Sequence, residues 1–168
     1  MTHAPTDLAI RIATAADVPH ILRFIRALAV YEKLEGEVVA DEAQLRATLF
    51  GARPAADVII AYAGDTPAGF ALFFPNYSTF LAQPGIYLED LYVKPHLRGK
   101  GIGLALLKRL ARIASDRGCG RVEWEVLDWN EPSIQFYKKL GAVPLAEWTR
   151  YRLTVDAIEK LALRGDCV

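Results

Sequence analysis

Three glycines stand within five residues in the segment from Arg98 to Gly103, between an apolar stretch and a long amphipathic one. Glycines before a helix let backbone N–H groups converge on an anion at the positive helix end, so a phosphate group is the expected ligand. No Gly-Lys-Ser/Thr closes the segment and it lacks the pattern Gly-x-Gly-x-x-Gly, which argues against nucleotide hydrolysis and NAD binding. A tight turn without a ligand is the alternative interpretation.

Basic side chains gather around this segment. From Lys94 to Arg117 there are seven basic residues and one acidic residue, a local net charge of +6 in a chain whose 20 basic and 20 acidic residues cancel. Such a concentration suits a polyanionic small molecule, and an ordinary solvated helix face is the alternative. Because the whole chain is neutral, we do not expect non-specific binding to nucleic acid or to an anionic membrane.

Two adjacent carboxylates, Glu89 and Asp90, interrupt a strand expected from Ile86 to Val93. Their neighbours are largely apolar, so partial desolvation would raise the pKa of Glu89 and improve it as a base. Strict alternation along the strand places Asp90 on the opposite side. A structural role for one of the two carboxylates is the alternative.

The elements that must position these groups follow from hydrophobic periodicity and from capping and turn residues. Thr14 with Asp17, and Asp41 with Gln44, are typical of helix starts. The chain predicts a strand over 10–13, helices over 14–30 and 41–51, a hairpin of 58–63 with 68–74, a helix over 101–117, a strand over 121–126, a helix over 132–140, one or two strands within 145–153, and a helix over 155–163. This order indicates a mixed central α/β sheet flanked by helices.

Length and composition favour one domain over residues 1–168, with a core from about residue 8 to 163: the chain has 168 residues, 52% of them hydrophobic. No apolar run reaches the ~18 residues of a membrane span, and we see no secretion signal. The two cysteines, Cys119 and Cys167, have no metal-ligand spacing. We therefore expect a cytoplasmic protein without a metal.

The segment from Arg98 to Gly103 matches the Gln/Arg-x-x-Gly-x-Gly/Ala signature of the GCN5-related N-acetyltransferase (GNAT) superfamily. Together with Trp129–Ser133 and Phe136–Gly141, the chain resembles the spermidine/spermine (diamine) branch, from about Ile10 to Leu153. The resemblance implies a GNAT-like fold whose splayed parallel strands bind CoA, with acetyl-CoA as co-substrate. It also implies a homodimer, because related polyamine-type enzymes pair two copies.

The same resemblance supplies a cofactor site. The backbone of one strand would contact the pantetheine, the glycine segment would hold the pyrophosphate, and an Asn and a Ser would contact neighbouring groups of CoA. The residues are Leu91, Tyr92, Val93, Arg98, Gly99, Lys100, Gly101, Ile102, Gly103, Leu104, Asn130 and Ser133. Asn130 also stands two residues before Pro132, a pattern typical of a helix start, and both roles are compatible.

Acetyl transfer to an amine needs a neutral nucleophile, whereas an alkylamine with a pKa near ~10.4 is mostly protonated at pH 7. The resemblance assigns Glu89 to amine deprotonation or substrate contact, with Asp90 as a further substrate-binding residue. The departing CoA sulfur benefits from a proton, which a phenol of pKa ~10 can supply. Tyr137 matches the general acid of similar enzymes, and a core aromatic on the face of residues 133, 136 and 140 is the alternative.

The sequence defines the acceptor amine less closely than it defines the acetyl donor. The loop over 77–83 contains no acidic residue, so a polyamine would lack partners there, while Glu32, Glu35 and Glu37 offer negative charge elsewhere. The sequence is as consistent with a small primary amine, a diamine or an amino acid with an aminoalkyl side chain, such as a lysine analogue, as it is with spermidine. Two other functions remain open: a protein or peptide amine acetyltransferase, and a non-catalytic acyl-CoA-binding module.

Overall fold

The computed structural model describes residues 7–164. The chain divides into two compact units, Met1–Leu127 and Asp128–Val168. The expectation of one domain over the whole chain stays a prediction. None of the helices within residues 7–164 is long and apolar enough to cross a membrane.

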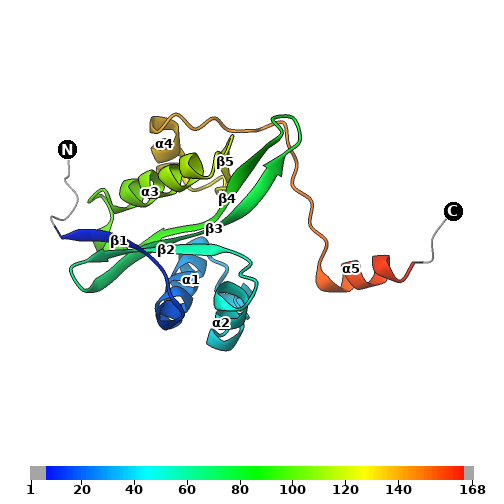
Figure 1. Cartoon of the computed structure of the whole chain (residues 1–168), viewed down its shortest axis with the longest axis horizontal. Coiled ribbons are helices and arrows are strands. Elements are labelled where there is room, and N and C mark those ends of the chain that lie inside the picture. The colour runs from blue at the N-terminus through cyan, green and yellow to red at the C-terminus, as the bar shows by residue number, and fades with distance from the viewer. Residues whose placement is uncertain (1–6, 165–168) are drawn as a thin grey trace. The chain divides into compact units, whose positions relative to one another are not determined.

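The first unit is built on a five-stranded sheet in the order β1-β2-β3-β4-β5 (Figure 1). The first four strands are antiparallel neighbours, whereas β4 and β5 run parallel. The strands are β1 (Leu8–Ile12), β2 (Asp57–Ala63), β3 (Thr66–Ser78), β4 (Gln83–Val93) and β5 (Val122–Trp124). The predicted hairpin and mixed sheet are confirmed, and β5 is shorter than the strand expected over 121–126.

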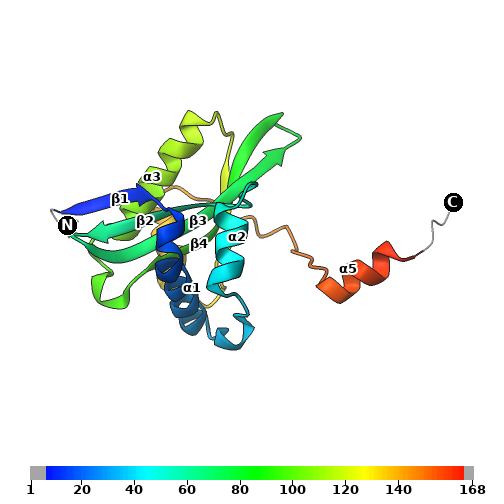
Figure 2. The ribbon, with the colours of Figure 1, turned by 60° about the horizontal axis from the view of Figure 1, so that its bottom comes forward.

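Helices cover both faces of the sheet. α1 (Val18–Glu32) and α2 (Glu42–Phe50) lie against one face, and α3 (Ile102–Asp116) crosses the other, as Figures 1 and 2 show. Single 3₁₀ turns occur at Ala15–Asp17, Glu35–Glu37 and Pro95–Leu97. Both predicted capping boxes, Thr14 with Asp17 and Asp41 with Gln44, are present.

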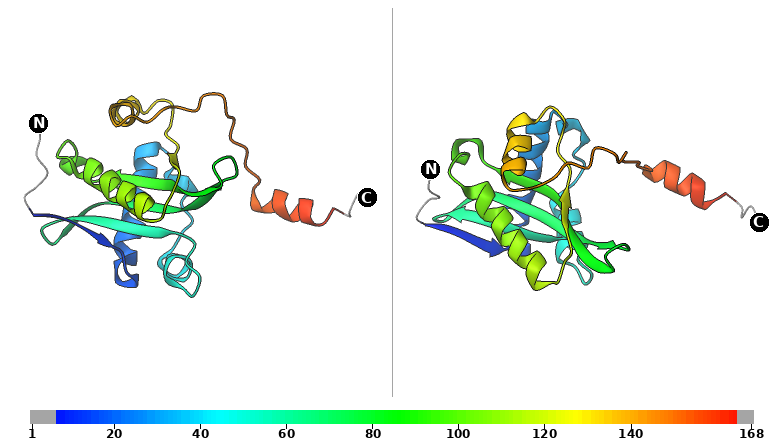
Figure 3. Two further views of the ribbon diagram at one scale, coloured as in Figure 1. Left: turned by 45° about the horizontal axis from the view of Figure 1, so that its top comes forward. Right: turned by 90° about the horizontal axis from the view of Figure 1, so that it is seen from above.

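The side chains of each strand alternate between two apolar cores, one on each face of the sheet. Val58 and Ile60 of β2 pack beneath α1, where the ring of Phe24 stacks on Phe70 at a centroid distance of 5.3 Å. The intervening residues Ile59 and Ala61 pack on the other side, against the buried face of α3 that consists of Ile102, Leu106, Leu110 and Ala114. The view in Figure 3 shows α3 lying across this second face. The sheet is therefore fixed from both sides.

A bulge interrupts β4. Leu72 of β3 pairs with Asp90, yet its neighbour Phe73 pairs with Leu88, so Glu89 is an extra residue on the β4 side. Ile86 and Leu88 belong to the core under α3, and Leu91 and Val93 pack against that same core. An odd number of steps separates Leu88 from Leu91, and only an inserted residue lets both face α3.

The second unit contains α4 (Glu131–Lys139) and α5 (Val155–Ala162), close to the predicted helices. The strands expected within 145–153 are wrong: the structure has no strand there. Large apolar side chains such as Leu145, Trp148 and Tyr151 are exposed in this segment. Neither face of the expected strand is consistently apolar, since Glu147 shares the face of Leu145 and Tyr151, and an extended segment without a paired neighbour gains no ladder hydrogen bonds.

Candidate active site

The bulge turns Asp90 toward the α1 face, the side on which the next-but-one residue, Tyr92, packs against Phe24. Asp90 is half-buried there. Burial, together with the negative charges of Glu89 and Glu32, raises the pKa of its carboxyl to about 7. Burial also raises the pKa of Glu32. Two carboxyls from β4 and α1 thus share an environment that disfavours their ionisation.

This arrangement corrects the expectation for Glu89. Its side chain is exposed, so the desolvation that we expected at Glu89 occurs instead at Asp90. The strict alternation that placed the two carboxylates on opposite sides does not apply across an inserted residue. The carboxyl whose pKa is raised toward neutrality is therefore that of Asp90.

Glu32 joins this site although the sequence offered it only as one of three acids after the first helix. In the structure α1 continues to Glu32, and the left-handed residue Lys33 ends the helix. The helical geometry fixes the carboxylate opposite β4, whereas Glu35 and Glu37 lie beyond the helix in an exposed turn. The signal that could have identified Glu32 is its position seven residues after Ile25, on the apolar stripe of the helix.

The glycine segment forms a turn that opens α3. Gly99 and Gly101 have φ angles of 74° and 76°, a conformation that other residues rarely adopt, and Gly101 is the N-cap of the helix. The N–H groups of the first helical turn, from Ile102 to Leu104, have no partner within the helix and point toward its N-terminal side. Ile102 itself is buried in the core, so backbone rather than side-chain groups would contact an anion here.

Beyond the bulge, β4 has an open edge. The parallel pairing with β5 joins only Ile86–Leu88 to Val122–Trp124. Within residues 7–164, no strand pairs with Leu91, Tyr92 or Val93 on the side of β4 that faces β5. Since their side chains enter the two cores, these residues present backbone N–H and C=O groups at that edge.

Arg98, the first residue of the glycine turn, contacts protein groups. Its guanidinium carbon lies 4.5 Å from the ring centre of Tyr31 and 5.6 Å from that of Tyr92. Its Nε donates a hydrogen bond of 3.0 Å to the Val93 carbonyl oxygen. Arg98 thus joins the turn to both α1 and β4. Lys100, the other basic residue of the turn, is exposed.

The remaining predicted site residues belong to the second unit. Asn130 is buried and caps α4, and its Oδ1 accepts a hydrogen bond of 3.4 Å from the Ser133 backbone N–H. The predicted helix start is confirmed. Tyr137 is half-buried on α4, with its ring 5.5 Å from that of Phe136.

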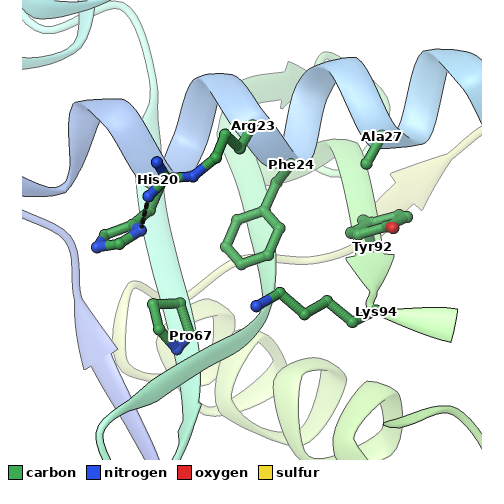
Figure 4. A pocket seen from close by; sticks show the side chains of 7 residues that line it. All are labelled: His20, Arg23, Phe24, Ala27, Pro67, Tyr92 and Lys94. Carbon is green, nitrogen blue, oxygen red and sulfur yellow. Dashed lines mark hydrogen bonds between the residues drawn. The ribbon is translucent and has the colours of Figure 1, made fainter. Parts of the chain in front are cut away.

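A hollow of about 400 Å³ opens beside α1 (Figure 4). Its lining residues are His20, Arg23, Phe24, Ala27, Pro67, Tyr92 and Lys94. It has basic and aromatic walls and no carboxylate, so its charge disfavours a cationic amine. The acidic site at Asp90 is the better place for such a group. Residues 7–164 contain no cluster of three or more His, Cys, Asp or Glu side chains that could hold a metal ion.

Comparison with known proteins gives consistent matches. Residues 22–142 match the model of the Acetyltransferase (GNAT) family. The chain is 41% identical over 164 residues to thialysine N-epsilon-acetyltransferase of Bos taurus, covering 91% of this chain and 96% of that protein. It is 36% identical over 197 residues to L-ornithine N5-acetyltransferase of Arabidopsis thaliana, covering 90% and 86%. The structure of an integron cassette protein from V. cholerae aligns with a TM-score of 0.78 at 29% identity, covering 94% of this chain and 99% of that one.

We expect Asp90→Asn to stabilise the protein more at pH 8 than at pH 5. A carboxyl whose pKa rises on folding from 3.8 to about 7 binds its proton more tightly in the folded state, so its contribution to stability is lost as pH rises through that window. The stabilisation should be larger at pH 8 by about 2 kcal/mol, measured by urea denaturation. Glu37→Gln, an exposed control, should show no such difference. Equal effects of Asp90→Asn at both pH values would contradict the burial of an ionisable Asp90.

Proposed function

The chain belongs to the GNAT acetyltransferase family, and from this premise we propose that it transfers the acetyl group of acetyl-CoA directly to a primary amine of a small molecule. The observation that carries the proposal is the buried carboxyl of Asp90 beside Glu32, next to the open edge of β4. This site attracts a cation and can accept its proton, while the adjacent backbone and glycine turn suit a phosphorylated thioester.

Three features support acetyl-CoA as co-substrate. The left-handed glycines and the free N–H groups that open α3 suit a pyrophosphate. The unpaired backbone of Leu91 to Val93 offers alternating donors and acceptors to the amides of pantetheine. Asn130 and Ser133, at the start of α4, are proposed from the resemblance to contact neighbouring groups of CoA.

For the acceptor we propose an amino acid with an aminoalkyl side chain, or a small diamine. The named relatives act on thialysine and on L-ornithine, both amino acids that carry a side-chain amine. The acidic surroundings of Asp90 and Glu32 favour an ammonium group over a neutral or anionic one. The tip of the hairpin formed by β3 and β4, residues 77–83, still offers no acid for the further ammonium groups of a long polyamine.

The reaction then needs three proton transfers. Asp90, directly or through a water molecule, takes a proton from the ammonium group, and the freed nitrogen attacks the carbonyl carbon of the thioester. As the carbon–sulfur bond breaks, its electron pair goes to the sulfur, and the Tyr137 hydroxyl, assigned from the resemblance, supplies the proton that leaves CoA as a thiol. The nitrogen loses its second proton to solvent as the amide forms, and the Tyr137 oxygen regains a proton from solvent. The exposed Glu89 contributes negative charge that helps to attract the amine and raises the pKa of Asp90.

A panel of acceptors tests the proposed activity. We expect one equivalent of CoA thiol to be released per amine acetylated, with small diamines and aminoalkyl amino acids preferred over peptides. Gly101→Val should weaken CoA binding about tenfold or more, because the φ of 76° is strained for a β-branched residue and its side chain obstructs the helix start. CoA binding without transfer to any amine would indicate the non-catalytic module instead, and preference for peptides would indicate a protein acetyltransferase.

The pH dependence separates the two adjacent carboxylates. The value of kcat/KM should rise with pH through about 7, because only deprotonated Asp90 accepts a proton. Asp90→Asn should remove this limb and lower kcat/KM about 100-fold or more. Glu89→Gln should instead move the limb to lower pH, since it removes one charge that raises the pKa of Asp90. Loss of the limb in Glu89→Gln and its retention in Asp90→Asn would restore Glu89 as the base.

Tyr137→Phe tests the proton donor. The substitution removes only the hydroxyl, so we expect kcat to fall at least tenfold while the affinity for acetyl-CoA, measured by calorimetry, stays within about twofold. A chloroacetyl thioester or another activated donor should reduce the loss if breakage of the carbon–sulfur bond is the affected step. Unchanged turnover with both a good and a poor amine would rule out the assignment.

The assembly and location are also proposals. Exposed apolar side chains in both units, such as Phe80 at 96% exposure and Tyr151 at 90%, support a homodimer. Light scattering that shows a monomer at micromolar concentration would contradict it. A cytoplasmic location is supported by the low number of cysteines: Cys119 is a free thiol, and Cys167 lies outside the residues that the structure describes.

A further inference from the structure

The side chain of Arg98 is exposed, and it contacts three protein groups. Its guanidinium lies over the ring of Tyr31 from α1 and near the ring of Tyr92 from β4, and its Nε is committed to the Val93 carbonyl oxygen. The backbone of the same residue leads directly into the two left-handed glycines of the turn. Arg98 therefore connects the glycine turn and the end of β4 to α1, which is far from both in the sequence.

Each aromatic partner of Arg98 stands beside a member of the acidic site. Tyr31 precedes Glu32 on the last turn of α1. Tyr92 follows Asp90 by two residues and packs on the same face of β4. A displacement of Arg98 would thus remove a contact between the glycine turn and the last turn of α1, which carries Glu32.

The chemistry of arginine suits this position. A planar guanidinium can stack on a ring and still donate from Nε in its own plane, whereas the ammonium group of a lysine is a compact point charge without such a plane. A lysine at this position would keep the positive charge and lose the geometry. The substitution Arg98→Lys therefore distinguishes two roles of this residue: attraction of a phosphate by its charge, which lysine keeps, and fixation of the glycine turn by its geometry, which lysine loses.

We propose that Arg98 is a positioning residue that fastens the glycine turn to the end of α1, so that CoA binding at the turn and the ordering of the Glu32–Asp90 site are coupled. The inference rests on the proposed use of CoA. It assigns Arg98 a role through Tyr31 and Tyr92, in contrast to a direct charge contact with a phosphate. Such a link lets CoA bound at the glycine turn influence the acceptor site at Glu32 and Asp90.

A double-mutant cycle with CoA as the probe tests the link. By calorimetry, we expect Arg98→Lys and Tyr31→Leu each to weaken CoA binding about two- to fivefold, and the double variant to lose no more than either single variant. The salt dependence of binding should stay unchanged in Arg98→Lys. Tyr31→Phe keeps the ring and should bind CoA more tightly than Tyr31→Leu does. Arg26→Lys, which alters an exposed arginine of α1, is the matched control.

Hydrogen exchange gives a second readout that does not depend on turnover. CoA should slow amide exchange over residues 28–34 in the wild type and in Arg26→Lys, and this protection should be lost in Arg98→Lys and Tyr31→Leu at saturating CoA. Circular dichroism and thermal melting should show that each variant is folded.

Several results would overturn the proposal. Additive losses in the double variant, or an effect of Arg98→Lys with none of Tyr31→Leu, would indicate a direct phosphate contact. Tighter CoA binding in either variant would show that the stack competes with the cofactor. CoA binding by the wild type without protection of residues 28–34 would refute the link alone, whereas no CoA binding by the wild type would refute both the link and the proposed function.

Discussion

The candidate site depends on one extra residue in β4. Before the bulge, Ile86 and Leu88 pack under α3, and after it Leu91 and Val93 pack under the same helix. Without the insertion, every side chain after Leu88 would change face, and Tyr92 would leave the core that it forms with Phe24. The packing of two cores therefore stabilises the bulge. The same bulge places Asp90 on the α1 face, opposite Glu32, where burial raises its pKa.

The bulge also explains where the sheet opens. A bulge increases the local twist of a strand, and the parallel pairing of β4 with β5 ends at Leu88, directly before the inserted Glu89. From there the backbone of β4 continues to the 3₁₀ turn and the glycines, and the buried stripe of α3 fixes the helix that they open. The open edge and the place of Asp90 opposite Glu32 thus follow from one break in pairing, and the packing of α3 fixes the helix N-terminus that comes after it.

The sequence predicted what local patterns encode. The capping boxes, the hairpin and the apolar stripe of α3 depend on neighbours within a few residues, and all appear in the structure. The bulge has a sequence signal as well, because the apolar positions change parity between Leu88 and Leu91. The partnership of Asp90 with Glu32 has no such signal, since it joins residues far apart in the chain. The strand expected within 145–153 failed because its pattern is weak and local preference cannot supply a paired neighbour.

The raised pKa of Asp90 reconciles two demands on one carboxyl. An anionic group must attract an ammonium ion, yet the nitrogen must lose its proton before it can attack. Proton transfer from an alkylammonium with a pKa near ~10.4 to an ordinary aspartate with a pKa near ~3.9 is uphill by about 9 kcal/mol. With a pKa of about 7 for Asp90, the same transfer costs only about 5 kcal/mol. The burial and like-charge repulsion that disfavour the ionised carboxyl therefore lower the cost of generating the nucleophile, and the negative charge of the site attracts the ammonium ion. The basic hollow beside α1 has the opposite charge and offers neither effect.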